Sequence, residues 1–436
     1  MHDGRLRRFL YSKRMLLSFI LAVTALSLLL KNRHSFTTLS AHEISRAQSE
    51  TTAATATEGS PVDGSFFGLT VLDYENVKPA LTFGITRTWD AYPGLDWADA
   101  NPSPGEYKFR PLDNYLSMYG GTGHEVIYTF GRTPRWASTR PDQKGAYFEG
   151  QCGAPNLDAW DAYVRAIVQH AAGRIHYWEL WNEPDQSRFY CGDIPQLVQM
   201  AQHAYPIIKQ LDPSAVVLSP AMTGGAGAGV LAQFIAGGGG KTFDAVAFHG
   251  YEGTNAEAII PIVAVYRHAL ASYNLDVNLP LIDTECSWGG NPIGDEAHQA
   301  AFLAKYFILQ SSAKVSRVLW YAYDGDPQWG RLIDSQNHLL QDGVAYAETY
   351  KWLVGSVLQS ACVADSTGTW TCQVSRPEGY QALIVWNSNA TNDIGYRVPG
   401  WAVDYRDLAG HVTSVINGSV PIGNNPILIE SKPLPV

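Results

Sequence analysis

Eight short apolar runs alternate with longer segments of helical period along most of this chain, and this alternation constrains the fold more than any other feature. The runs are apolar at nearly every position, whereas the segments between them repeat apolar residues every three or four positions. Strands that are apolar on both faces and separated by helices form a parallel sheet. The runs are SFFGLTV, GITRTWD, EVIYTFG, IHYWELWNE, AVVLSPAM, FDAVAFHGY, PLIDTE and RVLWYAYD.

Residues 156–173 show the helical period most clearly. Asn156 is a typical N-cap and Gly173 a typical stop signal. The predicted buried face of this helix consists of Trp160, Tyr163, Val164, Ile167, Val168 and Ala171. Eight such strand and helix units predict an α/β fold, a (β/α)8 TIM barrel over residues 62–356. The glycine-rich stretches around Gly224 and Gly237 lack the spacing of a phosphate-binding motif and are predicted to be loops.

The pattern changes after about Leu358, where the helical period ends. Short runs such as TWTCQVS, YQALIVWNS and PILIES are separated there by Gly, Asn and Pro. This spacing is typical of antiparallel strands. We therefore predict a small C-terminal β-sandwich module over residues 357–436.

The N-terminus carries an export signal. Five basic residues precede an apolar run, Met15 to Leu30, which lies between the usual lengths of a signal-peptide core and a membrane-spanning helix. Residues 1–31 are thus predicted to be a signal peptide or a membrane anchor, and residues 32–61 a flexible tether. Both alternatives place the main body outside the cytoplasm, secreted or tethered to the membrane by this segment alone.

Five cysteines agree with an oxidising compartment. Cys362 and Cys372 bracket a predicted hairpin and are expected to pair, while Cys152 and Cys191 could join loops on either side of one strand. Cys286 is left over, and all five could instead be reduced and buried. The net charge of −10 argues against nucleic acid or an anionic membrane surface as the main partner. No oligomeric state is indicated.

Acidic residues and a histidine lie at the ends of three predicted strands. The fourth strand ends on Glu183, the sixth contains His249 and Tyr251, and the seventh ends on Glu285. In a barrel of this kind the carboxyl ends of the strands meet at one mouth, where catalytic groups lie. Two carboxyls that face one cleft are what glycoside hydrolysis requires, one as proton donor and one as nucleophile or base.

The environments of the two glutamates are expected to differ. Trp181 and a second carboxylate would raise the pKa of Glu183, while Arg87 at the end of the second strand would keep Glu285 ionised. Glu179 and Asp283 compete for these roles, because the period of two places them on the same faces but deeper in the barrel. They could instead be buried partners of Arg87. Each glutamate could also be a structural acid at a strand end.

The segments YWELWNEPD and DTECSWG resemble the retaining glycoside hydrolases of clan A. The segments TRTWD, TPRWAS and FDAVAFHGY are similar to glycoside hydrolase family 39 and its relatives, over most of the chain from about Gly64. The resemblance implies Glu183 as general acid/base and Glu285 as nucleophile. It further implies that Asn182 binds the 2-hydroxyl of a sugar. The remaining implied residues are Arg87 and Tyr251, which would orient Glu285, and His249, which would line the same pocket.

The expected partner is a carbohydrate, with no metal ion or organic cofactor. Trp320 and Trp288 are interpreted as sugar platforms or, equally, as packing residues. Family resemblance favours β-linked sugars such as xylosides, or internal cleavage of a polysaccharide. Two rival functions are a carbohydrate-binding barrel without activity and a transglycosylase that uses the same covalent intermediate.

Overall fold

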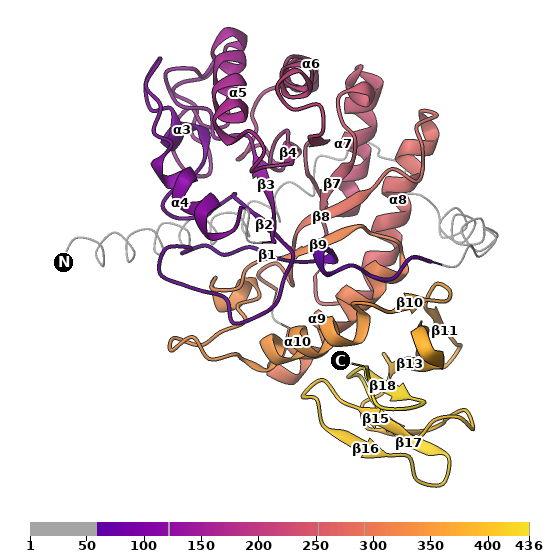
Figure 1. Cartoon of the computed structure of the whole chain (residues 1–436). Coiled ribbons are helices and arrows are strands. Elements are labelled where there is room, and N and C mark those ends of the chain that lie inside the picture. The colour runs from indigo at the N-terminus through magenta and orange to yellow at the C-terminus, as the bar shows by residue number, and fades with distance from the viewer. Residues whose placement is uncertain (1–58, 121–122, 252, 292, 436) are drawn as a thin grey trace. The chain divides into compact units, whose positions relative to one another are not determined.

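The computed structural model describes residues 59–120, 123–251, 253–291 and 293–435 (Figure 1). The predicted signal peptide or anchor (1–31) and most of the tether (32–61) lie outside these residues. Within the described ranges, none of the helices combines the length and the apolar character that a membrane crossing requires. The described residues belong to one compact unit, which contains both the barrel and the C-terminal module.

A parallel sheet forms the centre of this unit. Its strands follow the order β5-β4-β3-β2-β1-β9-β8-β7-β6, and every pair in it is parallel. An isolated bridge between Leu218 and Ala245 joins the end of β5 to the residue before β7, so the sheet closes. The strands are β1 (Phe67–Leu69), β2 (Ile85–Arg87), β3 (Glu125–Thr129), β4 (Tyr177–Glu179), β5 (Val216–Leu218), the short β6 (Met222–Thr223), β7 (Val246–His249), β8 (Leu281–Cys286) and β9 (Arg317–Trp320).

Helices follow the strands in alternation, and Figure 1 shows them around the outside of the sheet. The predicted TIM barrel is therefore confirmed. The helices are α3 (Trp97–Ala100), α4 (Arg110–Met118), α5 (Leu157–Ala171), α6 (Ile194–Leu211), α7 (Gly224–Ala236), α8 (Ile259–Ser272), α9 (Glu296–Ser312) and α10 (Gln341–Leu353). Short 3-10 turns are η1 (Gly64–Phe66), η2 (Gly239–Lys241), η3 (Ala256–Ala258), η4 (Pro327–Trp329) and η5 (Pro377–Gly379).

Helix α5 forms as its sequence predicts. The Asn156 side chain accepts hydrogen bonds from the backbone N–H groups of Asp158 and Ala159, which caps the first turn. Its six predicted core residues are the six that are buried. The period of the sequence was therefore enough to fix both the start of this helix and the face that it turns to the sheet.

Helix α7 corrects a prediction, because the glycine-rich stretch at Gly224 begins a helix and is not a loop. Glycine disfavours helix interiors by about 1 kcal/mol per residue relative to alanine. Close packing offsets this cost here. A Cβ on Gly227 would lie 2.7 Å from the Cβ of Met222 and 2.8 Å from the hydroxyl of Tyr266, so only glycine lets the helix approach this closely.

The C-terminal module is built from antiparallel strands, and the predicted β-sandwich is confirmed. The larger sheet follows the order β10-β12-β13-β18-β15-β16, with β11 beside β12, and a second sheet pairs β14 with β17. The strands are β10 (Val357–Leu358), β11 (Val363–Ala364), β12 (Thr369–Arg376), β13 (Tyr380–Asn387), β14 (Ile394–Arg397), β15 (Asp404–Arg406), β16 (Val412–Ser414), β17 (Ser419–Ile422) and β18 (Ile427–Glu430). Apolar residues of both sheets, such as Leu383 and Val420, share one cluster.

Two disulfides are present, Cys152–Cys191 and Cys362–Cys372, while Cys286 is buried with a free thiol. Cys152–Cys191 ties the segment between β3 and α5 to the segment that follows β4, and it spans 39 positions. Cys362–Cys372 spans 10 positions within the module. Both of the expected pairings are therefore formed.

Replacing Cys152 and Cys191 together with alanine is expected to lower the free energy of unfolding by about 3–4 kcal/mol, because closing a loop of this length restricts the unfolded chain. Thermal unfolding measures the loss. The matched control is the Cys362/Cys372 double alanine variant, which should leave the loops around the barrel mouth unchanged. An unaltered unfolding midpoint for the Cys152/Cys191 variant would contradict a stabilising role for this bond.

Candidate active site

Glu183 reaches the barrel mouth through a turn and not at the end of a strand. The sequence predicted that the fourth strand ends on Glu183, but β4 ends at Glu179. Beyond it, Asn182 forms a bridge with Ala221, and the Glu183 N–H donates to the Ala221 carbonyl at 2.9 Å. The φ of Glu183 is 43°, in the left-handed region that non-glycine residues seldom adopt. Such strained conformations concentrate at functional sites, where the surrounding structure holds them.

Two further residues at the same mouth have this conformation. Asp90 (φ 62°) follows β2, and Arg132 (φ 58°) follows β3. Arg132 forms ion pairs with Asp90 and Asp96, and Asp90 also accepts hydrogen bonds from Tyr147 and Tyr321, both at 2.9 Å. The sequence analysis did not identify this network. The signal that could have revealed it is Asp90, the acidic end of the run GITRTWD.

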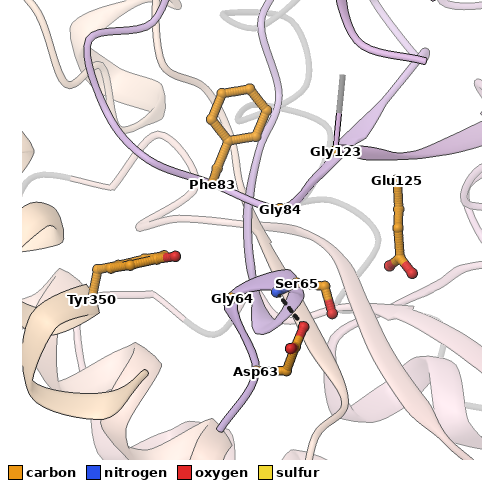
Figure 2. Close-up of a pocket in the computed structure, with 8 residues that line it drawn as sticks. All are labelled: Asp63, Gly64, Ser65, Phe83, Gly84, Gly123, Glu125 and Tyr350. Carbon is orange, nitrogen blue, oxygen red and sulfur yellow. Dashed lines mark hydrogen bonds between the residues drawn. The ribbon is translucent and has the colours of Figure 1, made fainter. Parts of the chain in front are cut away.

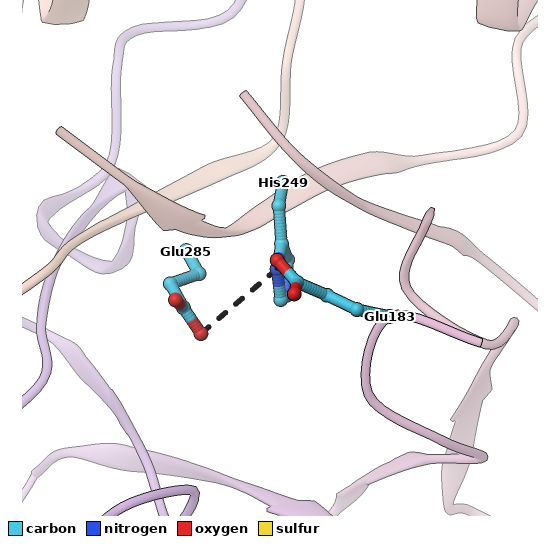
Figure 3. A group of neighbouring side chains, drawn as sticks. All are labelled: Glu183, His249 and Glu285. Carbon is cyan, nitrogen blue, oxygen red and sulfur yellow. Dashed lines mark hydrogen bonds and ion pairs between the residues drawn. The ribbon is translucent and has the colours of Figure 1, made fainter. Parts of the chain in front are cut away.

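Glu183, His249 and Glu285 come together from three different parts of the barrel, and Figure 3 shows their side chains converging. The His249 Nδ1 lies 2.8 Å from Oε1 of Glu183 and 3.9 Å from Oε2 of Glu285. One ring nitrogen of His249 and one carboxylate oxygen of each glutamate all lie within 4.8 Å of one another. All three residues are buried, with exposed fractions of 5%, 0% and 8%. The two predicted carboxyls therefore face each other across one small gap.

Arg87 and Tyr251 hold Glu285 by both of its oxygens. Arg87 Nη1 donates to Oε2 at 2.8 Å, and the Tyr251 hydroxyl donates to Oε1 at 2.9 Å. Arg87 also donates from Nη2 to Oδ1 of Asn182 at 2.8 Å and from Nε to Oε2 of Glu179 at 2.9 Å. Arg87, Tyr251 and Asn182 therefore all lie beside the glutamate pair.

The competing acids Glu179 and Asp283 lie deeper and have other partners. Glu179 is the buried partner of Arg87, and it also accepts a hydrogen bond from Thr129 at 2.7 Å. Asp283 accepts from the Gly250 N–H at 3.0 Å and from Gln310 at 2.8 Å. Both acids are fully buried. Their contacts suit them for holding Arg87 and β8 in place, and not for contact with a substrate.

The structure reverses the expected order of the two pKa values. Burial raises the pKa of Glu285, the charges of His249 and Arg87 offset this only in part, and the charge of Glu183 adds to the increase. Burial also acts to raise the pKa of Glu183, but the hydrogen bond and charge of His249, together with Arg188 and Thr223, lower that pKa. Burial acts to lower the pKa of His249, yet the two glutamates raise it. The expectation for Glu183 was wrong because it considered Trp181 and a second carboxylate and not His249.

Neither predicted tryptophan offers a ring face at the mouth. Trp320 and Trp288 are 0% and 1% exposed, and their rings pack edge to face with centroids 5.5 Å apart. Trp320 also donates from Nε1 to the Gly330 carbonyl at 2.6 Å. The platform interpretation is therefore corrected to a packing role. Trp329 of η4, which the sequence analysis missed, is half-buried and its ring centroid lies 5.7 Å from that of Tyr251.

Arg188 adds a cation close to the pair. Its Nη2 lies 4.0 Å from Oε2 of Glu183, and its side chain is 51% exposed. The Arg188 carbonyl accepts hydrogen bonds from Ala146 N–H at 2.8 Å and from Gln151 at 2.6 Å, so the backbone here is well fixed. No periodic pattern or motif in the sequence marks this residue, since it lies in a loop.

Glu183, His249 and Glu285 also have the spacing of three metal ligands. However, Arg87 already places a positive charge 2.8 Å from Oε2 of Glu285, which disfavours a second cation there. His249 Nδ1 is likewise engaged with Glu183. This arrangement favours the sharing of a proton between His249 and Glu183 over the binding of a metal ion.

A separate pocket of about 320 Å³ lies at the opposite end of the barrel (Figure 2). It is lined by residues that precede strands, including Ser65 before β1, Gly84 before β2 and Gly123 before β3. Because catalytic groups of TIM barrels lie at the carboxyl ends of the strands, this pocket is not the active-site mouth.

The fold is similar to that of solved glycoside hydrolase structures. No family model matches the sequence, and no curated protein matches it. A family 39 glycoside hydrolase from Bacteroides cellulosilyticus WH2 superimposes with a TM-score of 0.67 and 19% identity, over 85% of this chain and 80% of that chain. A family 39 β-xylosidase from Caulobacter crescentus gives a TM-score of 0.63 and 18% identity, over 86% and 98%.

The fold is that of the family 39 glycoside hydrolases. A family 30 subfamily 8 xylanase from Clostridium acetobutylicum is also similar, with a TM-score of 0.58 and 14% identity, over 86% of this chain and 97% of that chain. The resemblance found in the sequence is thus confirmed for the architecture of the barrel and its C-terminal module. At these identities the family 39 likeness concerns the fold, so function rests on the geometry of the site.

Proposed function

We propose that this protein is a retaining glycoside hydrolase that cleaves O-glycosidic, β-linked bonds, with Glu183 as acid/base and Glu285 as nucleophile. The observation that carries the proposal is that carboxylate oxygens of the two residues lie within 4.8 Å of each other. Retaining enzymes place their carboxyl groups about 5–5.5 Å apart, whereas inverting enzymes leave about 6.5–9.5 Å for a water molecule. The close spacing supports direct attack by a carboxylate.

In the first step, an oxygen of Glu285 attacks the anomeric carbon while Glu183 gives a proton to the departing glycosidic oxygen. The bond from the anomeric carbon to the leaving group breaks, and an ester to Glu285 forms. The proton comes from the Glu183–His249 pair, whose hydrogen bond of 2.8 Å lets it lie on either partner. Arg87 and Tyr251 fix the carboxylate of Glu285 for the attack.

In the second step, Glu183 takes a proton from a water molecule, which attacks the anomeric carbon and releases Glu285. The configuration of the sugar is then retained, because two inversions have occurred. Asn182 contributes to both steps in this proposal. Since its Oδ1 accepts from Arg87 at 2.8 Å, its amide N–H groups are oriented to donate, as binding of a sugar 2-hydroxyl requires.

The test is a screen of aryl glycosides and soluble polysaccharides, with xylosides first because two of the similar structures are named as a β-xylosidase and a xylanase. Glu183→Gln and Glu285→Gln serve as controls for contaminating activity. Turnover by the native chain that Glu285→Gln loses on every substrate, and that Glu183→Gln loses on the polysaccharides, supports the proposal. No turnover on any substrate, with retained binding, would favour the carbohydrate-binding barrel. Analysis of products with an added acceptor sugar separates hydrolysis from transglycosylation.

We further propose that the protein acts outside the cytoplasm, with an N-terminal signal or anchor (1–31), a tether (32–61), the catalytic barrel (62–356) and the module (357–436). Two disulfides support an oxidising compartment. The last barrel helix, α10, ends at Leu353 and the first module strand begins at Val357, which supports the boundary between barrel and module.

Substitution of His249 by asparagine is expected to narrow the pH profile of kcat/KM. The charge of His249 lowers the pKa of Glu285, so its loss moves the acidic limb to higher pH. In the wild-type protein the catalytic proton can lie on Glu183 or on His249. In the variant only Glu183 can hold this proton, so the proton dissociates at lower pH and the basic limb of the profile moves to lower pH. Initial rates from pH 4 to 9 measure both limbs. A profile of unchanged width would contradict the shared proton.

A further inference from the structure

A second cavity lies between the barrel and the C-terminal module, and we call it the seam cavity. Its volume is about 540 Å³. The barrel contributes the segment after β7, the segment after β8 and helix α9, while the module contributes β12 and the turns after β13 and β17. Its lining residues include Asn255, Glu257, Lys305, Trp370, Asn389 and Asn424.

One wall of the seam cavity is a fixed polar network that joins barrel and module. Lys305 is only 4% exposed, donates to Oδ1 of Asn424 at 2.5 Å and lies 3.4 Å from Oε1 of Glu257. The same oxygen of Glu257 accepts a hydrogen bond from Nε1 of Trp386 at 3.0 Å. The positive charge of Lys305 is balanced by the negative charge of Glu257. The wall is therefore polar but neutral, which does not favour an anionic or a cationic ligand.

The module side of the seam cavity presents an aromatic ring. Trp370 is half-buried and stacks on Trp386, with centroids 5.6 Å apart and planes 6° apart. This stacking holds the indole in one orientation. Side-chain amides of Asn255 and Asn389 line the same cavity and are exposed. Asn255 Oδ1 accepts from the Glu257 N–H and Asn389 Nδ2 donates to the Thr367 carbonyl, both at 3.1 Å, so these bonds orient the two amides. A flat aromatic ring bordered by oriented amides suits the apolar face and the hydroxyl rim of a neutral sugar.

The seam cavity lies on the same side of the barrel as the active site. The segment after β7 carries Tyr251, which contacts Glu285, and a few residues later Asn255 and Glu257, which line the cavity. The segment after β8 likewise runs from Glu285 to His298 at the cavity. Both features are therefore built from the carboxyl-end loops of neighbouring strands.

We propose that the seam cavity binds a neutral oligosaccharide segment of a polymeric substrate, at a distance from the bond that is cleaved. The claim that this polymer is a substrate rests on the proposed glycosidase function. Binding of the oligosaccharide in the seam cavity does not depend on that function. This chain would then act on neutral polysaccharides and not only on short glycosides.

Affinity electrophoresis tests the binding, with full-length Glu285→Gln protein in gels that contain soluble arabinoxylan, β-glucan, galactomannan or, as an anionic contrast, polygalacturonate. At least one neutral polymer should retard the protein, and Trp370→Ala should weaken that retardation about 10-fold, as expected for loss of a central aromatic contact. Asn389→Ala should weaken it less. Retardation by no neutral polymer, or equal retardation of the Trp370→Ala protein, would overturn the proposal.

Trp401→Ala is the matched control, because Trp401 is a half-buried tryptophan that packs against the other apolar cluster of the module. It should bind polymer as Glu285→Gln does. Thermal unfolding of each variant separates lost binding from lost folding, and Asn389→Ala keeps the test valid if Trp370→Ala unfolds. Expression in a bacterial host leaves the Asn389-Ala390-Thr391 sequon unmodified.

Rates of hydrolysis test the seam cavity separately from the proposed glycosidase function. With Glu285 intact, Trp370→Ala should lower kcat/KM on the retarding polymer about 10-fold and leave kcat/KM on an aryl glycoside unchanged. An equal loss on both substrates would contradict a site remote from the cleaved bond. If the protein shows no turnover on any substrate but still binds polymer through Trp370, the proposed glycosidase function is wrong and the proposed binding site stands.

Discussion

Replacing Glu285 with glutamine is expected to lower turnover of an aryl glycoside by about 10⁴-fold or more, because the covalent route then has no nucleophile. Glutamine keeps the size of the side chain and can still meet Tyr251 and Arg87, so the loss is chemical and not structural. The measurement is kcat with the best substrate from the screen. Glu348→Gln is the control, since Glu348 is a buried glutamate on α10, outside the site.

Shortening Glu285 to alanine or glycine adds a sharper criterion. The space left beside Arg87 should admit azide, which attacks an activated substrate and gives a glycosyl azide of inverted configuration. Rate recovery with that product supports Glu285 as the nucleophile. An inverted azide product from a shortened Glu183 variant instead would reverse the two roles, and full activity of Glu285→Gln would exclude the mechanism.

Replacing Glu183 with glutamine is expected to lower kcat/KM by about 10²–10⁴-fold for substrates with poor leaving groups, because protonation of the departing oxygen is lost. Substrates with a good leaving group, such as a dinitrophenyl glycoside, need little protonation and should lose much less. The ratio of the two losses is the measurement. Equal losses for both classes of substrate would contradict the acid role.

Asp185→Asn is the matched control for Glu183→Gln. Asp185 lies two residues further along the same turn and contacts the backbone N–H of Thr223 at 3.1 Å. This variant tests whether disturbance of the turn alone lowers kcat/KM. The account predicts a loss of less than about 10-fold for Asp185→Asn, with no dependence on the leaving group.

Much of the architecture could be predicted because it depends on period and on strand spacing. The capped helix α5 needs only local sequence, and the short distance between Glu183 and Glu285 follows from the closure of a parallel sheet. Arg87, Tyr251 and His249 were found for the same reason, since each lies in or directly after a strand.

Features that depend on tertiary contacts could not be predicted. The end of β4 at Glu179 and the left-handed turn at Glu183 depend on the pairing of Asn182 with Ala221. The lowered pKa of Glu183 depends on the rotamer that brings His249 to 2.8 Å. Burial of Trp320 depends on how helix α9 packs, because the Trp320 ring lies against Phe302 and Phe307 of that helix.

The proposed mechanism depends above all on covalent capture of the sugar by Glu285. The most direct test is mass spectrometry of peptides after inactivation with a 2-deoxy-2-fluoro derivative of the best substrate, which slows release of the intermediate. We predict one labelled peptide, with the sugar on Glu285. A label on Glu183 or Glu179, or steady turnover with retention and no labelled peptide, would contradict the proposed mechanism.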